Sequence, residues 1–197
     1  MLASKSPRRK YLLEQAGISV EVSPSGVDEE TLSHTDPESH ARILAEAKAL
    51  DVAERIPDSW VIGADTIVVA GKDVLGKPGS DTEARNMLKQ LSGQCHRVIT
   101  GWCVCCRKRN QLFSDAVSTD VWFKTLSDAE IDWYIHTGEP FDKAGAYAIQ
   151  GLGTFLVKSI RGSYTNVVGL PVCEIIEILL QQDILRYRDR SGEKEIS

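Results

Sequence analysis

The sequence lacks an excess of positive charge. Its 23 Lys and Arg residues are outnumbered by 28 Asp and Glu residues, which gives a formal net charge of -5. This balance argues against a broad electrostatic surface for nucleic acid, and no nucleic-acid partner is expected. An anionic ligand would have to be held by a local cluster of bases, so the positions of the lysines and arginines matter more than their number.

The sequence also lacks the ~20 consecutive apolar residues of a membrane-spanning helix. Its first residues lead directly into Ser4-Lys5-Ser6, without the apolar centre of a secretory signal. We therefore expect a cytoplasmic protein with no membrane partner.

A disulfide framework is missing as well, because the five cysteines are odd in number and three of them crowd into positions 103–106. These three would suit a soft metal, but no second Cys/His pair lies at zinc-finger spacing. We expect buried thiols in a strand.

Helical and strand periodicities alternate along the chain, which indicates an α/β fold. Residues 1–185 are predicted to form one domain, and residues 186–197 a charged tail. The patterns predict helices that begin after Ser6, Asp36, Ser80 and Ser127 and at Pro171. They predict strands at 18–22, 60–70, 96–107, 112–124, 154–160 and 164–168, with a turn or hairpin at 71–73.

The segment Ser6-Pro7-Arg8-Arg9 breaks a local rule. A helix N-terminus carries a partial positive charge and normally attracts acidic side chains, yet two arginines follow the cap here. A bound phosphate would reverse this effect, since free N–H groups, the Ser6 hydroxyl and the guanidinium groups would converge on it. The alternative is an ordinary solvated basic helix start.

Asp65 is unusual because it interrupts the apolar run from Val61 to Val69. A carboxylate inside a strand must be paired, bound to metal or placed at the strand end. In a cleft it would suit general-base work on water or metal binding, whereas at a strand end it would cap a turn. Asp28, in an acidic loop with Glu29 and Glu30, is a further candidate for a Mg²⁺ site, although for this triplet viewed alone a solvated acidic loop is the better explanation.

The segment from Gly71 to Pro78 nearly matches a P-loop. Pro78 stands where that motif requires a Ser or Thr, so we reject the P-loop interpretation and keep Lys77 as a candidate phosphate ligand. The segment 138–151 combines small residues with the polar Lys143 and Gln150. It would let a ligand approach the backbone, and Gln150 could read a base edge; the alternative is a structured surface loop.

Together these segments resemble the Maf family of nucleotide pyrophosphatases. The resemblance runs from Leu2 to about Leu180 and rests on LASKSPRR, VIGADTIVV, LGKP, LSGQCHRVITG, GEPFDKAGAYAIQGLG and GSYTNVVGLP, in that order. It implies an α/β fold like that of inosine-triphosphate pyrophosphatases, with a long bent mixed sheet, flanking helices and two lobes around a cleft. It also implies hydrolysis of the α–β bond of nucleoside triphosphates with a divalent metal, Mg²⁺ or Mn²⁺, and a homodimer.

The resemblance assigns roles position by position. Asp65 matches the proton acceptor, and Asp28 and Asp65 match the metal-associated carboxylates. The substrate contacts match Ser6, Arg8, Arg9, Lys48, Lys77 and Lys143. Only the resemblance makes Lys48 a candidate substrate contact, because from the residues alone it looks like an exposed helix lysine.

Three positions imply the base preference. Family members that act on dTTP and UTP have Arg, Thr and Gln where this chain has Arg8, Thr66 and Gln150, whereas members that prefer 7-methyl-GTP have Trp, Gln and Glu. The expected activity is therefore pyrophosphate release from dTTP and UTP. The alternatives are a 7-methyl-GTP pyrophosphatase and a non-catalytic, nucleotide-binding regulator of cell division.

Overall fold

A computed structural model of the protein describes residues 1–28 and 36–186. The acidic pair Glu29-Glu30 and residues 187–197 of the predicted tail lie outside this part of the chain. None of the described helices has the length and apolar character needed to cross a bilayer. The elements, in chain order, are α1 (Pro7–Gln15), α2 (Pro37–Arg55), β1 (Val61–Ala70), β2 (Asp73–Leu75), α3 (Asp81–Leu91), β3 (Cys95–Cys106), β4 (Gln111–Phe123), α4 (Asp128–His136), η2 (Glu139–Asp142), η3 (Ala144–Ala146), η4 (Gly151–Phe155), β5 (Val157–Arg161), α5 (Tyr164–Val168) and α6 (Val172–Gln181).

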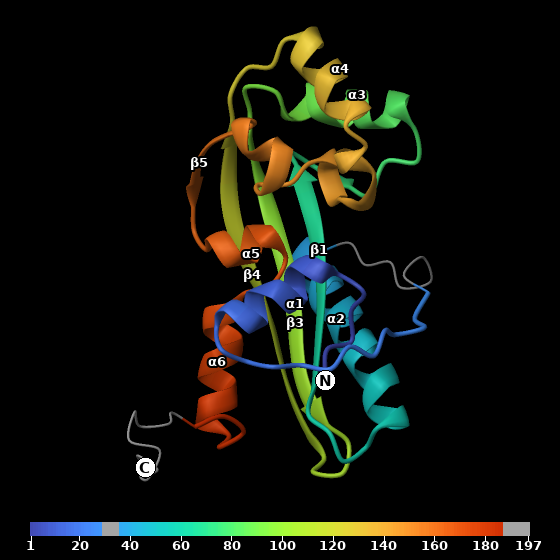
Figure 1. Cartoon of the computed structure of the whole chain (residues 1–197), viewed down its shortest axis with the longest axis vertical. Helices are drawn as coiled ribbons and strands as arrows, with labels where there is room; N and C mark the ends of the chain where they lie inside the picture. Colours follow the sequence, from blue (N-terminus) through green and yellow to red (C-terminus); the bar gives the residue numbers. More distant parts are fainter. Residues whose placement is uncertain (29–35, 187–197) are drawn as a thin grey trace.

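A five-stranded sheet in the order β2-β1-β3-β4-β5 forms the centre of the molecule, and its named strands all pair antiparallel. The long strands β3 and β4 run through two lobes (Figure 1). Helices α3 and α4 belong to the upper lobe, while α1, α2, α5 and α6 surround the lower part of the sheet. The predicted α/β fold with two lobes is thus confirmed. The parallel component of the sheet consists of isolated bridges from Leu2 to Val22 and Ile62.

The outer edge of β1 is interrupted. On that side β2 pairs with Val68–Ala70, and the N-terminal segment bridges Ile62 through Leu2. Within the part of the chain that the structure describes, no strand pairs with this edge between the two contacts, whereas the other edge pairs with β3 from Val61 to Val69. The interruption exposes the middle of a central strand to a ligand.

Helix α2 packs very closely against one face of β1 and β3. A Cβ atom on Gly63 would lie 2.4 Å from the carbonyl oxygen of Ala45, and one on Gly101 would lie 2.1 Å from that of Ala41. Only glycine permits this approach of backbone to backbone. The side chains that face α2 farther along β3 include Cys103 and Cys105, which are buried as expected.

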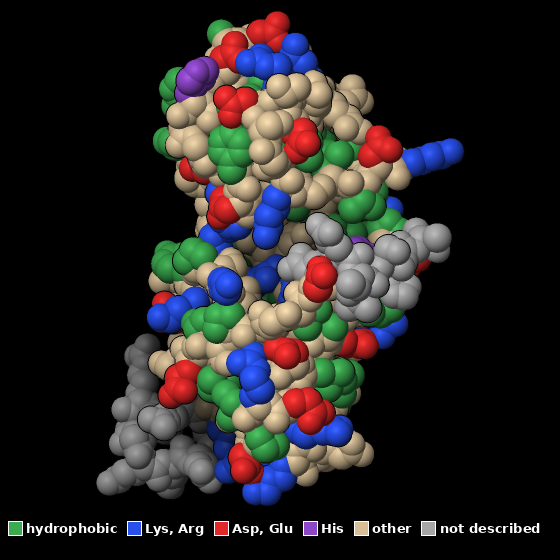
Figure 2. All heavy atoms as spheres, turned by 90° about the vertical axis from the view of Figure 1, so that its right-hand side faces the viewer, with side chains coloured by type: hydrophobic (Ala, Val, Ile, Leu, Met, Phe, Trp, Pro, Cys, Tyr) green, Lys and Arg blue, Asp and Glu red, His purple; other side chains and the backbone are tan. Residues whose placement is uncertain are grey.

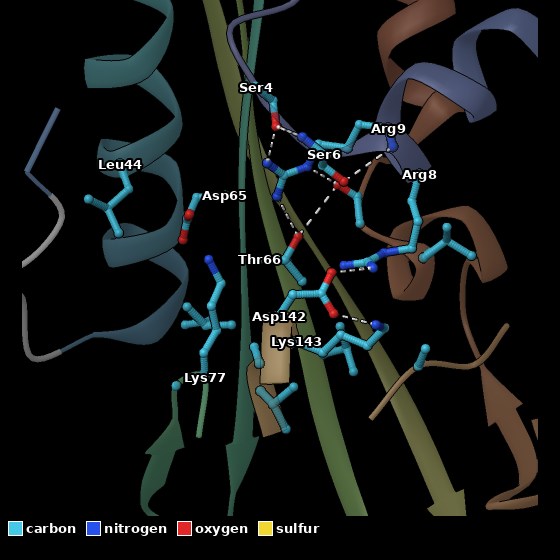
Figure 3. A pocket seen from close by; sticks show the side chains of 18 of the residues that line it. Ser4, Ser6, Arg8, Arg9, Leu44, Asp65, Thr66, Lys77, Asp142 and Lys143 are labelled. Atoms are coloured by element: carbon cyan, nitrogen blue, oxygen red, sulfur yellow. Dashed lines mark hydrogen bonds and ion pairs between the residues drawn. The ribbon is translucent and has the colours of Figure 1, made fainter. Parts of the chain in front are cut away.

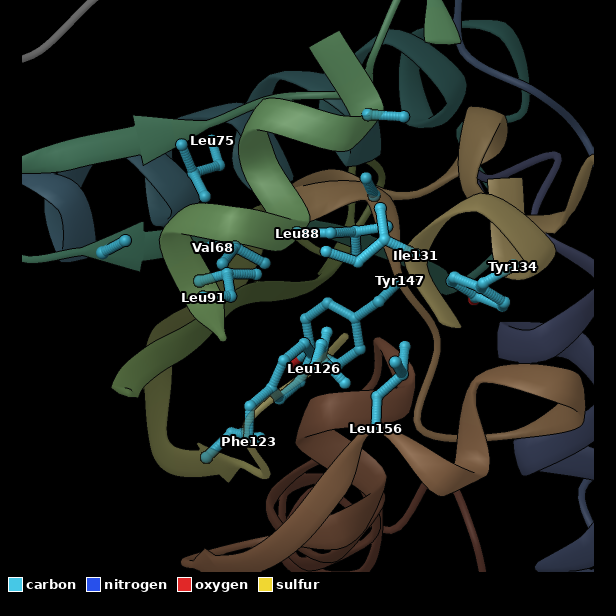
Figure 4. Packing of buried hydrophobic residues seen from close by; sticks show 14 of the residues in the cluster. Val68, Leu75, Leu88, Leu91, Phe123, Leu126, Ile131, Tyr134, Tyr147 and Leu156 are labelled. Atoms are coloured by element: carbon cyan, nitrogen blue, oxygen red, sulfur yellow. The ribbon is translucent and has the colours of Figure 1, made fainter. Parts of the chain in front are cut away.

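The upper lobe has its own core, built from α3, α4, the ends of the strands and the η segments (Figure 4). Leu88 of α3 lies beside Ile131 of α4 in this core, to which Leu91 and Tyr134 also belong (Figure 4). Helix α4 begins after Ser127, as predicted, with a capping box between Ser127 and Glu130, and Gly138, with φ of 75°, follows its end. The lobe therefore forms a packed support for the segment 138–153.

Two predicted strands are wrong. Residues 18–22 form only a single bridge, from Val22 to Leu2. The N-terminal segment that faces them pairs through Leu2 alone, so no strand of several residues can form. Residues 164–168 form the short helix α5, because the Ser163 hydroxyl accepts a hydrogen bond from the Asn166 N–H at 3.2 Å. The strand predicted at 154–160 begins later, at Val157, since the preceding residues belong to η4.

The glycine contact with α2 generates a stability prediction. Gly101→Ala should lower the free energy of unfolding by about 3 kcal/mol, because the added methyl group meets backbone atoms that cannot rotate away. Gly76→Ala is the matched control: nothing lies within 4 Å of its added Cβ, and its effect should stay within about 0.5 kcal/mol. Denaturant unfolding measures both; equal losses would contradict this packing.

Candidate active site

A cleft of about 770 Å³ lies between the lobes, beside the interrupted edge of β1. Lys and Arg side chains gather around this hollow (Figure 2). Of the residues predicted from the sequence, the cleft is lined by Ser6, Arg8, Arg9, Lys48, Asp65, Thr66, Lys77, Lys143 and Gln150. Asp28 is exposed and does not line the cleft, although its neighbour Val27 does.

Asp65 lies in the middle of β1, not at a strand end, which excludes the turn-capping interpretation. Its Oδ1 accepts a hydrogen bond of 2.6 Å from the Nζ atom of Lys48 on α2, and each side chain is only 9% exposed. A buried charge of this kind is tolerated when it is paired. The absence of a Cβ on Gly101, the β3 partner of Asp65, allows α2 to bring Lys48 this close.

Thr66 points to the opposite face of the sheet, because neighbouring residues in a strand alternate. There its Oγ1 atom accepts a hydrogen bond of 3.1 Å from Nη2 of Arg9 and lies 3.0 Å from the hydroxyl of Thr100. Arg9 also donates through Nε to the Gly169 carbonyl at 2.8 Å and through Nη1 to Ser4 Oγ at 3.0 Å (Figure 3). This guanidinium therefore joins α1 to β1 and to the end of α5.

Asp142 links the two lobes across the cleft. Its Oδ2 accepts from Arg8 Nη1 at 3.2 Å, and its Oδ1 pairs with Lys143 Nζ (Figure 3). Burial raises the pKa of Asp142, but Lys143 and Arg8 lower it more, so the net pKa lies below the ordinary value. This carboxylate therefore lies against two side chains that were predicted to bind phosphate.

The other residues that were predicted to bind the nucleotide differ in burial and in their contacts. The Ser6 hydroxyl caps α1 by accepting from the Arg9 N–H at 3.4 Å, as predicted. Lys77 is exposed, and its side chain extends toward Asp65 (Figure 3). Gln150 is half-buried at the start of η4 and faces the same cleft. The segment 138–153 thus forms a structured loop that also lines the cleft.

A divalent cation would find few protein ligands here. Among residues 1–28 and 36–186, no group of three His, Cys, Asp or Glu side chains could hold a metal ion. Mg²⁺, however, is often held by one or two carboxylates together with substrate phosphates. Asp65, in a cleft lined by cationic side chains, fits that second arrangement.

Sequence reasoning from residues alone missed Lys48, but a signal was present. The buried face of α2 includes Leu44, Lys48 and Val52, which are spaced four residues apart. A lysine within such an apolar stripe requires a partner, and Asp65 is the carboxylate that interrupts the neighbouring strand. Glu139, whose contacts lie within the upper lobe, was not singled out either.

His96 and Tyr147 form a buried pair at the cleft, which Tyr147 lines. The Nε2 atom of His96 lies 2.7 Å from the Tyr147 hydroxyl, and Phe123 packs edge-on against both rings. The Nδ1 atom of His96 is buried without a hydrogen-bond partner among the described residues. Burial lowers the pKa of His96 to about 4, so the ring is neutral at neutral pH.

Comparison with known proteins places these features in a family. A family model described as "Maf-like protein" matches residues 1–182. The dTTP/UTP pyrophosphatase of Geotalea uraniireducens is 52% identical over 91% of this chain and 92% of its own length. Proteins of the same name from Syntrophus aciditrophicus and Halalkalibacterium halodurans are 44% and 49% identical, over 99% and 91% of this chain and 97% and 93% of their own lengths.

The buried histidine predicts a pH dependence of stability. Its folded pKa, about 4, lies below the ordinary value of 6.5, so between these values the unfolded chain binds a proton that the folded chain does not. Stability should therefore fall as the pH drops through this window, by about 3 kcal/mol from this residue. In urea unfolding, the loss between pH 7 and pH 4 should be about 3 kcal/mol larger in the wild type than in His96→Gln, because carboxylates with lowered pKa values contribute equally in both. The exposed His136→Gln should behave like the wild type; an equal loss in all three would contradict the assignment to His96.

Proposed function

The chain belongs to the Maf family, and from that membership we propose that it hydrolyses nucleoside triphosphates, chiefly dTTP and UTP, to the monophosphate and pyrophosphate. Support comes from relatives of 44–52% identity that carry the name dTTP/UTP pyrophosphatase and align over at least 91% of the chain. The observation that carries the proposal is the buried Lys48–Asp65 pair at the interrupted edge of β1.

In the proposed reaction, Asp65 acts as the general base. Its Oδ1 is held by Lys48 at 2.6 Å, which fixes the plane of the carboxylate, and Oδ2 accepts the proton of a water molecule. The water oxygen forms a bond to the α-phosphorus as the bond from the α-phosphorus to the bridging oxygen breaks. Pyrophosphate leaves with that oxygen. General-base catalysis needs a carboxylate of fixed orientation, and the buried ion pair with Lys48 keeps the Asp65 carboxylate from rotating.

The basic side chains would neutralise the triphosphate. We assign the phosphates to the start of α1 with Arg8, and to Lys77 and Lys143 from the facing lobe. Binding would replace the carboxylate of Asp142 by phosphate oxygens at Arg8 and Lys143. Arg9 donates hydrogen bonds to Ser4, Thr66 and Gly169. It would therefore contact phosphate and, above all, hold the start of α1 in place against β1.

A divalent cation, when bound, would offset phosphate charge. Asp65 would hold it together with substrate oxygens, and Asp28, on the segment that continues from Val27, is the second proposed ligand. Mg²⁺ and Mn²⁺ both suit oxygen ligands of this kind.

The base preference is assigned to Arg8, Thr66 and Gln150. A uracil or thymine ring presents a carbonyl oxygen beside an N–H, and the Gln150 amide offers the matching donor and acceptor. Thr66 would act through the hydrogen bonds that fix Arg9 and the end of α5. A homodimer, a single domain over residues 1–185 and a cytoplasmic location remain predictions.

The proposal is tested by pyrophosphate release from UTP, dTTP and 7-methyl-GTP with Mg²⁺ or Mn²⁺. Wild type should prefer dTTP and UTP, and Asp65→Asn should lower kcat by about 10²–10⁴-fold, because the general base is lost. Asp115→Asn, which changes an exposed carboxylate on β4, should retain full activity.

Two outcomes would overturn the assignment. Preferential turnover of 7-methyl-GTP would contradict the roles of Arg8, Thr66 and Gln150. Tight binding of UTP without turnover by the wild type, unchanged in Asp65→Asn, would favour a nucleotide-binding regulator of cell division.

A further inference from the structure

Glu139, at the start of η2, accepts hydrogen bonds from three separate groups. Its Oε1 atom accepts from the Tyr134 hydroxyl at 2.9 Å and from the Gly153 N–H at 3.0 Å, and its Oε2 atom accepts from the Leu152 N–H at 3.0 Å. One side chain thus ties the beginning of the 138–153 segment to its end and to α4. Burial raises the pKa of Glu139, but these donors and Lys143 lower it more, so the carboxylate is ionised at neutral pH.

The backbone near the far end of the segment is shaped around this carboxylate. Gly151 has φ of 69°, and a Cβ atom there would lie 2.7 Å from Oε2 of Glu139. A side chain at this position would therefore displace the carboxylate. Gln150 directly precedes Gly151. The hydrogen bonds from Leu152 and Gly153 to Glu139 fix the η4 backbone and thereby the position of Gln150 at the cleft.

The backbone of Glu139 and the side chain of its partner Tyr134 reach two more points of the cleft wall. The Glu139 carbonyl oxygen accepts from Lys143 Nζ at 2.7 Å, which places that ammonium group at the cleft. The Tyr134 hydroxyl, which donates to Glu139, accepts from the Ala148 N–H at 3.2 Å. The loop that lines the cleft from Asp142 to Gln150 is thereby connected to Glu139 at Lys143, at Ala148 through Tyr134, and just beyond Gln150 at Leu152 and Gly153.

We propose that Glu139 is a positioning residue that sets the distance between the phosphate-binding Lys143 and the base-reading Gln150. Its carboxylate does not line the cleft, so it acts through the residues it holds. This inference rests on the proposed function, because it takes a nucleotide as the ligand that spans the two side chains. A displaced loop should weaken nucleotide binding and base discrimination while leaving the Lys48–Asp65 pair, on β1 and α2, intact.

The test compares Glu139→Gln with Glu130→Gln. Glu130, also on the upper lobe, accepts from the Ser127 N–H and hydroxyl and pairs with Lys124, so its change removes a similar number of hydrogen bonds without touching the loop. Glu139→Gln should raise KM for UTP about tenfold and lower the preference for UTP over CTP, with kcat changed less than about threefold. Glu130→Gln should leave KM and the preference unchanged.

A second measurement does not depend on turnover. The Kd of α,β-methylene-UTP should rise about tenfold in Glu139→Gln, and Tyr134→Phe should raise it less. The double variant should show a non-additive effect, since both residues act through one set of hydrogen bonds. Thermal unfolding checks that each variant is folded at the assay temperature.

The outcomes separate the two proposals. Wild type that binds the analogue but releases no pyrophosphate would contradict the proposed function, and the Kd series would still test Glu139. Unchanged KM, Kd and base preference in Glu139→Gln, or equal changes in Glu130→Gln, would overturn the positioning role. Wild type that does not bind the analogue would overturn both proposals.

Discussion

The carboxylate of Asp65 is held in the interior of a strand by the ammonium group of Lys48, and the rest of the site depends on that contact. A charged group in an apolar strand is costly unless a partner reaches it. Lys48 reaches it because α2 lies almost against the backbone of β1 and β3, at Gly63 and Gly101. The close packing of one helix therefore determines whether a carboxylate can be buried as part of an ion pair at this position.

The interruption at the edge of β1 makes the pair accessible. Because β2 covers only the upper end of the strand and Leu2 bridges Ile62 below, the cleft can contact both faces of the sheet. The side chains of Asp65 and Thr66 therefore point to opposite faces of the sheet, because the two residues are adjacent in a strand. The first face holds the carboxylate and Lys48; the second holds the Arg9 network that joins α1 to α5.

Much of this arrangement could be predicted from local sequence. The Ser6 cap, the capping box of α4 and the polar Asp65 within an apolar run each depend on a few neighbouring residues. The error at α5 arose because Thr165, Val167 and Val168 favour a strand, whereas the Ser163 cap and Gly169 after the helix end enforce a turn of helix.

The long-range contacts could not be predicted in the same way. Arg8 and Asp142 are separated by 134 positions, and Glu139 meets Leu152 and Gly153 only after the upper lobe has folded. Their geometry follows from the packing of α3 and α4 and not from a local pattern. The family resemblance pointed to Lys48, and its spacing with Leu44 and Val52 indicates a buried lysine, but its contact with Asp65 follows from the packing of α2 against β1.

In the proposed reaction, water attacks the α-phosphorus beside Asp65. Hydrolysis of UTP in ¹⁸O-labelled water, with mass analysis of both products, identifies the phosphorus atom that is attacked. Attack at the α-phosphorus should leave one ¹⁸O atom in the uridine monophosphate and none in the pyrophosphate. Label in the pyrophosphate would show attack at the β-phosphorus and would overturn the proposed reaction.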